Sequence, residues 1–467
     1  MKFQLLVLPG ALALAACTLG PDFKLPEVQI SSLWRESKFV SSPPTPDNWW
    51  KLFDDPDLTR LIEKAETTNH DLAAARARVE TSRALVGADR SKLFPSLNLS
   101  GSAATVRSSA DSLRGFQSPT GSLDLSSENY KSNFNLAYDP DLGGRNKRGL
   151  EASSAEAAAS LGQLDFQRLG VATEVARQYF LLRGLDAQNA VLISTLKSRQ
   201  DALAIENSKL AAGLSDGLAS SRARTEVQLA ENDIGSVQRQ RGSAEHALAI
   251  LCGQAPSEFS INPQSSNRII PVIRPGLPAE VLKRRPDVRA AEQNLRAANA
   301  RIGVATAAYY PNFNLITGAG LESLDFSNFL DWENRVLSLG ATATAPLFDG
   351  GLNRSNKKVA LSRYNETLAS YRQTLLVALR EVEDALVDLK GLGQSRDALE
   401  QALTSSQETL RLSRERYDKG LTSYFEVVDA ERGVLRVQLV LSQLEAQQRI
   451  TLAALAKALG GGWGAKG

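Results

Sequence analysis

The sequence has few of the side chains on which most catalytic and metal sites depend. Its 467 residues include 2 cysteines and 2 histidines. His70 and His246 stand apart, with no cysteine or carboxylate at the spacing of metal ligands. Cys252 has no partner for an intrachain disulfide once the other cysteine is assigned to processing, and its apolar neighbours predict a small buried side chain. No glycine-rich phosphate loop or serine elbow is present. We therefore expect no enzyme, no cofactor and no metal site.

Excess charge and long apolar runs are missing as well. The 54 basic and 52 acidic residues leave a net charge of +2, and this near balance argues against a surface for nucleic acid. No run of 18 apolar residues occurs after residue 17, so we expect no transmembrane helix. If the chain crosses a membrane, it does so as strands.

The first residues have the pattern of a lipoprotein signal. Lys2 supplies positive charge, and residues 5–15 form an apolar stretch that is too short to span a bilayer. The stretch ends in Leu-Ala-Ala-Cys, a lipobox, so we expect a signal peptide at 1–16 and acylation of Cys17. The residue after it is Thr18 rather than aspartate, which favours the outer membrane. The alternative is an ordinary cleaved signal followed by an incidental cysteine.

The chain contains two copies of one unit. Corresponding positions are Pro95 and Pro311 at a shift of 216 residues, and Gly143 with Gly350 and Gly213 with Gly420 at a shift of 207. A longer loop, rich in serine and glycine, in the first copy accounts for the difference between the two shifts. We expect a lipid-anchored segment at 17–48, a first repeat at 49–265 and a second repeat at 266–467.

Both repeats predict the same order of elements. The first has helices at 50–93, a β-hairpin at 95–140, a long helix at 144–211 and a return helix at 216–252. The second has a helix at 286–309, a hairpin at 311–348, a long helix at 352–418 and a return helix at 423–459. Apolar residues recur every seven positions in the long helices, as at Leu375, Val382 and Leu389. Each long helix would extend about 100 Å at 1.5 Å per residue, as in a strut rather than a globular core.

The hairpins alternate apolar and polar residues. One face of the return strand carries Tyr130, Phe134, Leu136 and Tyr138, and the other carries Lys131, Asn133 and Asn135. This pattern suits a strand between lipid and water, although a soluble, half-exposed hairpin would have it too. Two hairpins give four strands, which are too few to close a barrel, and an open edge is not tolerated in lipid. We therefore expect several copies to share one barrel, and three copies would supply twelve strands around water.

Several segments resemble the TolC-like outer-membrane efflux lipoproteins, in particular the OprM-like channels. These segments are residues 48–58, 276–292, 346–351 and 458–463. The resemblance implies an α+β membrane protein: a homotrimer with a twelve-stranded outer-membrane β-barrel, continuous with a long periplasmic α-helical barrel. It also implies passive export of drugs or other small molecules, with energy from a proton-driven inner-membrane transporter joined through a periplasmic adaptor.

The turns after the long helices are the expected periplasmic tip, where the adaptor would bind. They comprise Gly213, Leu214, Ser215, Asp216, Gly420, Leu421, Thr422 and Ser423, and the two glycines permit left-handed helix caps. The second turn resembles the gate of the family, whose residues match Tyr417, Glu426 and Asp429. Glu426 and Asp429 share a helix face, so a trimer would form a ring of carboxylates that attracts cations.

Simpler roles are open for these residues. Glu426 could complete a capping box that begins at Ser423, and Tyr417 could be a core residue of the heptad seam. The polar clamp of the family is also incomplete, because Ala219 stands where an aspartate is expected and Thr422 stands where an arginine sometimes occurs.

Two other functions fit part of the sequence. A duct of this kind could serve type I secretion of polypeptides instead of export of small molecules. A periplasmic adaptor lipoprotein without a channel would explain the heptads and the anchor, but it would not explain two alternating hairpins at equivalent places.

Overall fold

The computed structural model describes residues 18–28, 31, 33–36, 48–107, 109, 126–215, 217–264 and 270–461. The chain forms two compact units. Unit 1 comprises Met1–Pro26, Glu80–Ala159 and Glu292–Ser370, and unit 2 comprises Glu27–Val79, Ser160–Ala291 and Tyr371–Gly467. Each unit takes segments from both repeats, so the repeats and the compact units divide the chain differently. Cys17 and Asp216 lie outside the described residues.

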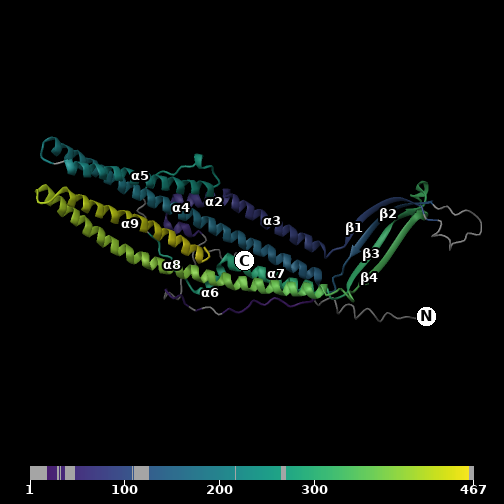
Figure 1. The fold of residues 1–467 in the computed structure, drawn as a ribbon. Helices are drawn as coiled ribbons and strands as arrows, with labels where there is room; N and C mark the ends of the chain where they lie inside the picture. Colours follow the sequence, from purple (N-terminus) through teal and green to yellow (C-terminus); the bar gives the residue numbers. More distant parts are fainter. Residues whose placement is uncertain are drawn as a thin grey trace, which may run out of the picture. The chain divides into compact units, whose positions relative to one another are not determined.

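The elements follow one another in the same order in both repeats (Figure 1). The first repeat contains η2 (Trp49–Phe53), α2 (Pro56–Thr68), α3 (His70–Ser91), β1 (Ser96–Arg107), β2 (Ser126–Tyr138), α4 (Arg145–Ala211), α5 (Gly217–Leu251) and η3 (Pro256–Glu258). The second contains α6 (Pro278–Arg284), α7 (Pro286–Ala307), β3 (Asn312–Ser323), η4 (Phe326–Asn328), η5 (Trp332–Asn334), β4 (Arg335–Thr344), α8 (Leu352–Asp418) and α9 (Tyr424–Ala458). Within the described ranges, no helix combines the length and the apolar character needed to cross a membrane.

The starts of α3 and α7 are fixed in the same way, and both lie in unit 2. The Asn69 amide donates to the carbonyl of Leu251 at the end of α5, at 3.0 Å. The Arg285 guanidinium donates to the carbonyl of Ala458 at the end of α9, at 2.9 Å. Each bond satisfies a carbonyl that the end of a helix leaves without an intrahelical partner. Corresponding positions of the two repeats therefore have the same packing role.

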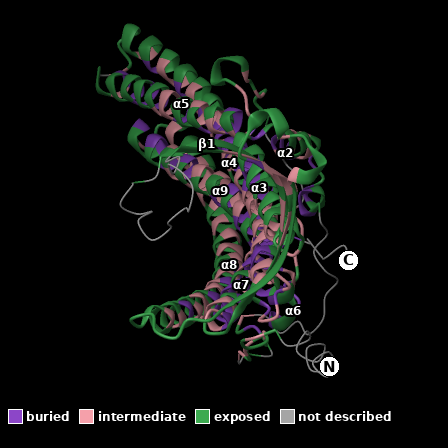
Figure 2. Cartoon of the chain, turned by 90° about the vertical axis from the view of Figure 1, so that its right-hand side faces the viewer, coloured by how far each residue is buried: buried purple, intermediate pink, exposed green. Residues whose placement is uncertain are grey.

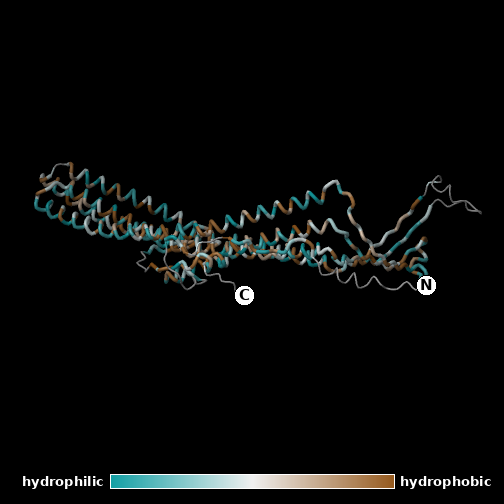
Figure 3. The backbone as a smooth tube through the Cα atoms, turned by 90° about the horizontal axis from the view of Figure 1, so that it is seen from below, coloured by the Kyte–Doolittle hydropathy of each residue, from teal (hydrophilic) through white to brown (hydrophobic). Residues whose placement is uncertain are grey.

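The heptad residues of α8 that belong to unit 2 form its buried face. Leu375 and Val382 are 3% and 0% exposed, whereas Leu376 and Val387, which lie off the seam, are 60% and 51% exposed. Figure 3 shows hydrophilic and hydrophobic segments alternating along the long helices. The seven-residue recurrence of apolar side chains gives each long helix one apolar stripe, along which it can pack.

The core of unit 2 contains the Trp-Trp pair near the start of the first repeat. Trp49 and Trp50 are 0% and 2% exposed, and they pack with Phe53, Leu182 and Leu248. Burying an apolar side chain of this kind contributes roughly 1.5–3 kcal/mol. Cys252 belongs to the same cluster and is fully buried, and burial raises the pKa of its thiol. The predicted buried cysteine is confirmed.

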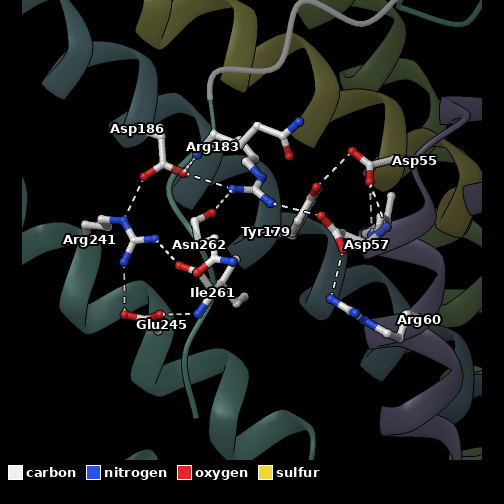
Figure 4. A network of polar contacts seen from close by, with 12 residues as sticks. Asp55, Asp57, Arg60, Tyr179, Arg183, Asp186, Arg241, Glu245, Ile261 and Asn262 are labelled. Carbon is white, nitrogen blue, oxygen red and sulfur yellow. Dashed lines mark hydrogen bonds and ion pairs between the residues drawn. The ribbon is translucent and has the colours of Figure 1, made fainter.

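A buried network of charges fixes the segment after α5 to the helices of unit 2. Figure 4 shows the guanidinium groups of Arg183 and Arg241 pointing towards the carboxylate of Asp186, at 3.0 and 2.7 Å. The same two arginines donate to the backbone carbonyls of Asn262 and Ile261, at 2.8 and 2.5 Å. Because each buried charge has partners, the network holds the chain between the repeats without leaving an isolated ion.

Candidate functional site

The sheet of unit 1 has one apolar face. Its four strands are antiparallel in the order β1-β2-β3-β4, and one cross-strand row of this face contains Leu99, Phe134, Ala319 and Leu337. Leu99, Phe134 and Leu337 are 65%, 53% and 82% exposed, and β1 is exposed along its whole length (Figure 2). A contiguous apolar surface of this kind marks a contact with lipid or with another protein.

The opposite face of the sheet is predominantly polar. One of its rows contains Asn98, Asn135, Gly318 and Ser338, and Val106, Ile316 and Val336 are its larger aliphatic members. Towards the outer ends of the strands, Lys131 forms an ion pair with Glu322 at 2.7 Å, and Asn129 donates to the same carboxylate at 3.2 Å. Amide, hydroxyl and paired charged groups are suited to contact with water.

Exposed aromatic side chains flank the strands of unit 1. Phe94, Tyr310 and Phe348, next to the helix-proximal ends of the strands, are 60%, 51% and 93% exposed. Phe326 and Trp332, in the connection between β3 and β4, are both 70% exposed. Aromatic residues are enriched at the two interfaces of membrane-spanning barrels, where an apolar ring meets polar headgroups.

The sheet ends in two edges, β1 and β4. No further strand pairs with either edge among the described residues. An edge strand offers a row of backbone donors and acceptors, and long exposed edges are normally paired, covered or charged. The two edges of this sheet are therefore candidates for pairing with strands of another chain.

The two tip turns in unit 2 have the same backbone geometry. Gly213 and Gly420 both adopt φ of 69°, in the left-handed region that favours glycine. The following amides of Leu214 and Leu421 each donate to a carbonyl of the preceding helix at 2.9 Å, which is the Schellman pattern of helix ends. These two leucines are 79% and 67% exposed.

Tyr417 joins the two long helices of unit 2. Its hydroxyl donates to the carboxylate of Glu206 at 2.5 Å and accepts from the ammonium of Lys209 at 2.7 Å. Glu206 is only 2% exposed, and Lys209 also lies over the Tyr417 ring, 4.4 Å from its centre. Burial and the bond to Glu206 raise the pKa of Tyr417, and the bond to Tyr417 raises the pKa of Lys209.

A second buried charge cluster connects α4, α5 and α9. Arg199 pairs with Glu226 at 3.0 Å and donates to its backbone carbonyl at 2.9 Å. Both side chains are 5% exposed. Arg432 on α9 binds the other oxygen of the Glu226 carboxylate. The buried carboxylate of Glu226 on α5 therefore connects α4 of the first repeat with α9 of the second.

Sequence reasoning missed Arg199, Glu206 and Glu226. Arg199 and Glu206 nevertheless continue a heptad seam, after Leu185 and Leu192 at seven-residue spacing. A charge at an apolar seam position is costly unless it is paired, and that conflict was a usable signal. Glu226 has no comparable signal, because its role depends on how α5 packs against α9.

The predicted gate carboxylates lie at the surface beside these clusters. The bond to Glu226, with a smaller contribution from the charge of Asp429, raises the pKa of Arg432. Glu426 and Asp429 are both exposed, and the Glu426 carboxylate lies 3.9 Å from the guanidinium of Arg416. Ser423 precedes α9, but its side chain makes no capping hydrogen bond, so the predicted capping box does not form.

Other predicted tip residues lie next to the same helix start. Tyr424 is buried, and its ring lies 5.6 Å from that of Tyr417. Ala219 packs beside the same apolar cluster. Arg222, at the start of α5, lies over the Phe425 ring, 5.1 Å from its centre. Tilted aromatic rings and a buried ion cluster therefore connect the helices near the tip turns, while Glu426 and Asp429 are exposed.

Comparison with known proteins gives consistent matches over nearly the whole chain. The family described as "Outer membrane efflux protein" matches residues 61–254 and 277–461. Outer membrane protein OprJ of Pseudomonas aeruginosa is 31% identical, over 97% of this chain and 94% of OprJ. The cation efflux system protein CusC of Escherichia coli O6:H1 is 31% identical, over 97% of each. The solved structure of the outer-membrane channel OprN superposes with a TM-score of 0.87 at 30% identity, covering 96% of this chain and all of OprN.

Proposed function

Because the chain belongs to the outer membrane efflux protein family, we propose that three copies of it form the exit duct of a tripartite efflux pump in the outer membrane. The observation that carries this proposal is the sheet of unit 1. It has an apolar face, a polar face and two edges that no further described strand covers. Three copies would join edge to edge into twelve strands, with lipid outside and water inside.

The remaining parts of the pump follow from family membership. We propose that Cys17 carries the acyl chains of a lipoprotein anchor and that residues 1–16 are removed. Multiple acyl chains give stable attachment to a membrane. A periplasmic adaptor would contact the exposed tip leucines Leu214 and Leu421, and an inner-membrane transporter, proton-driven in our proposal, would supply the energy.

Small molecules are the cargo that we propose. The polar face of the sheet carries amide and hydroxyl groups and the neutral ion pair of Lys131 with Glu322, rather than a pocket shaped for one ligand. A wall of this kind sets few chemical limits on what passes. Selection would therefore lie with the transporter and the adaptor.

The gate that we propose has two parts. Tyr417, held between Glu206 and Lys209, would keep the second long helix against the first. Glu426 and Asp429, exposed on the first turns of α9, would form a carboxylate ring in the trimer that attracts cations. Opening requires the buried contacts of Tyr417 to break, because they join α8 of the second repeat to α4 of the first.

Recording from planar bilayers tests the duct. The full-length, acylated protein is purified from outer membranes and inserted into a bilayer at neutral pH. We expect discrete single-channel currents, small in the resting state because the tip is closed. Absence of any current from protein that is correctly acylated and oligomeric would contradict the proposed function.

A further inference from the structure

Residues 18–23 lie against a set of buried polar groups and glycines in unit 1. We call Thr18–Phe23 the strap, and Gly143, Gly144, Arg148, Asn299 and Gly303 its seat. The Arg148 side chain is 5% exposed and donates to the carbonyls of Leu19 and Gly20 at 3.2 and 3.4 Å. It also pairs with the Asp22 carboxylate at 2.7 Å. A buried guanidinium thus binds three groups of the strap, namely two backbone carbonyls and one carboxylate.

Two further contacts complete the seat. Asn299, which is 5% exposed, donates to the carbonyl of Pro21 at 2.8 Å. The amide of Leu19 donates to the carbonyl of Gly143 at 3.4 Å. The backbone polar groups of the strap therefore form hydrogen bonds with the seat. These bonds fix which residue of the strap lies against which residue of the seat.

Missing side chains make room for the strap. A Cβ on Gly20 would lie 2.4 Å from Cα of Gly303, and a Cβ on Gly303 would lie 2.8 Å from the carbonyl oxygen of Leu19. A Cβ on Gly144 would lie 2.9 Å from Cα of Thr18. Gly303 stands inside α7, where glycine is among the poorest helix formers, so the close approach of the strap gives a reason for it.

The other repeat lacks this arrangement. Gly87 in α3 corresponds to Gly303, and Gly351 before α8 corresponds to Gly144, yet neither has an atom within 4 Å of a Cβ built there. Ser355 stands at the position that corresponds to Arg148. The glycines are therefore duplicated, but the strap and the arginine belong to one site.

The seat lies where the strands of unit 1 meet its helices. Gly143 and Gly144 separate β2 from α4, and Gly303 lies near the end of α7, shortly before β3. We propose that strap and seat hold the acylated amino terminus in register with the periplasmic ends of the membrane strands, so that acyl chains and strands enter the same leaflet together. This inference rests on the proposed acylation of Cys17, the residue that precedes the strap. A tether without a fixed register would need neither a buried arginine nor the helical glycine.

Two insertions of equal length test the register in the full chain. Thr-Gly-Ser-Gly placed between Cys17 and Thr18 keeps threonine after the cysteine and leaves the strap intact, but it separates anchor and seat by up to about 13 Å. The same four residues between Phe23 and Lys24 leave that register unchanged. We expect a several-fold loss of heat-resistant oligomer in outer-membrane fractions for the first insertion, and wild-type yield for the second.

Glycine substitutions provide a second, matched pair. Gly303→Ala obstructs the strap, whereas Gly87→Ala makes the same change at the corresponding position in open space. We expect Gly303→Ala to reduce the yield of heat-resistant oligomer and Gly87→Ala to leave it unchanged. In a Cys17→Ser background, Gly303→Ala should have no additional effect, because the anchor that the seat positions is absent.

Mass spectrometry of the amino-terminal peptide separates the two proposals. Acylated Cys17 with equal yields from both insertions would overturn the positioning role and leave the lipid anchor standing. A peptide without acyl groups in the wild-type protein would overturn the anchor itself. A loss for Gly303→Ala that persists undiminished in the Cys17→Ser background would show a purely structural role and would also overturn the inference.

Discussion

The two repeats have the same elements but contribute different groups to the tip. The long helices α4 and α8 each contain 67 residues, and their turns share one backbone geometry. In α4, charged residues occupy the last seam positions, Arg199 and Glu206. The corresponding positions of α8 are Ser406 and Ser413, and Tyr417 lies one turn further on.

This difference shows how two copies of one unit can supply complementary groups to a single contact between their long helices. The two repeats do not contribute equivalent groups to this contact. The first repeat supplies the buried carboxylate of Glu206 and the ammonium of Lys209, and the second supplies the Tyr417 hydroxyl that bonds to both. Each hairpin therefore needs the other, because a buried polar group without its partner is costly.

Of the variants considered, Glu226→Ala should weaken the contact between the helices of the two repeats most strongly. Glu226→Ala leaves Arg199 buried without its carboxylate and frees Arg432 from α4 and α5. Loss of one partner of a buried pair costs about 3–5 kcal/mol. Hydrogen exchange measured by mass spectrometry should show much faster exchange in the neighbouring parts of α4 and α9. Glu231→Ala, at an exposed position on the same helix, should leave exchange unchanged. Equal protection in both variants would contradict the role of Glu226 in holding α4 and α5 to α9.

Removing only the Tyr417 hydroxyl should have a smaller effect. Tyr417→Phe keeps the ring contact with Tyr424 but removes one of the two donors to the buried Glu206 carboxylate, at a cost of about 1–3 kcal/mol. The other donor, the ammonium of Lys209, remains at 3.1 Å. We expect a larger resting conductance in planar bilayers. Tyr364→Phe on the same helix is the control, since it lies outside this cluster. A resting conductance equal to that of the wild type would exclude Tyr417 from the gate.

High pH should weaken the same contacts in the wild-type protein. Burial raises the pKa of Tyr424 to about 12, and burial with the bond to Glu206 raises the pKa of Tyr417. A raised tyrosine pKa stabilises the folded state fully below the unfolded value near 10, and this contribution is lost as pH rises towards 12. Resting conductance should therefore rise between pH 10 and 12. Tyr424→Phe should make that rise smaller, and a flat profile would argue against closure by these rings.

Neutralising the exposed carboxylates should have the smallest effect on stability. Glu426→Gln with Asp429→Asn changes surface groups, so the free energy of unfolding should shift by no more than about 0.5 kcal/mol. Block by divalent cations should weaken if the two carboxylates form a ring in the trimer. Single-channel recording with and without added divalent cations measures this, and unchanged block would assign both residues to the solvated surface.

Local patterns predicted the elements well where periodicity was strong. The second long helix was expected at 352–418, and α8 spans Leu352–Asp418. The helices expected at 50–93 are η2, α2 and α3, which are separated where Asp54 takes a left-handed conformation and where Asn69 is extended. The resemblance carried by short segments is confirmed by the family match.

Contacts between distant segments were beyond prediction. Glu226 and Arg432 are 206 positions apart, and neither belongs to a local motif. In the sequence, Arg148 looks like an ordinary basic residue near the start of α4. Its contacts with the strap appear only in the structure. Such groups become visible only when the fold brings their partners together, whereas Tyr417 was found because a turn sequence resembled a known gate.

In the proposed assembly, the four-stranded sheet is one third of a closed wall made by identical chains. Native mass spectrometry of the acylated protein, released from detergent micelles, counts the chains directly. The account predicts a dominant species of three copies. A dominant monomer that still passes ions in bilayers would contradict it.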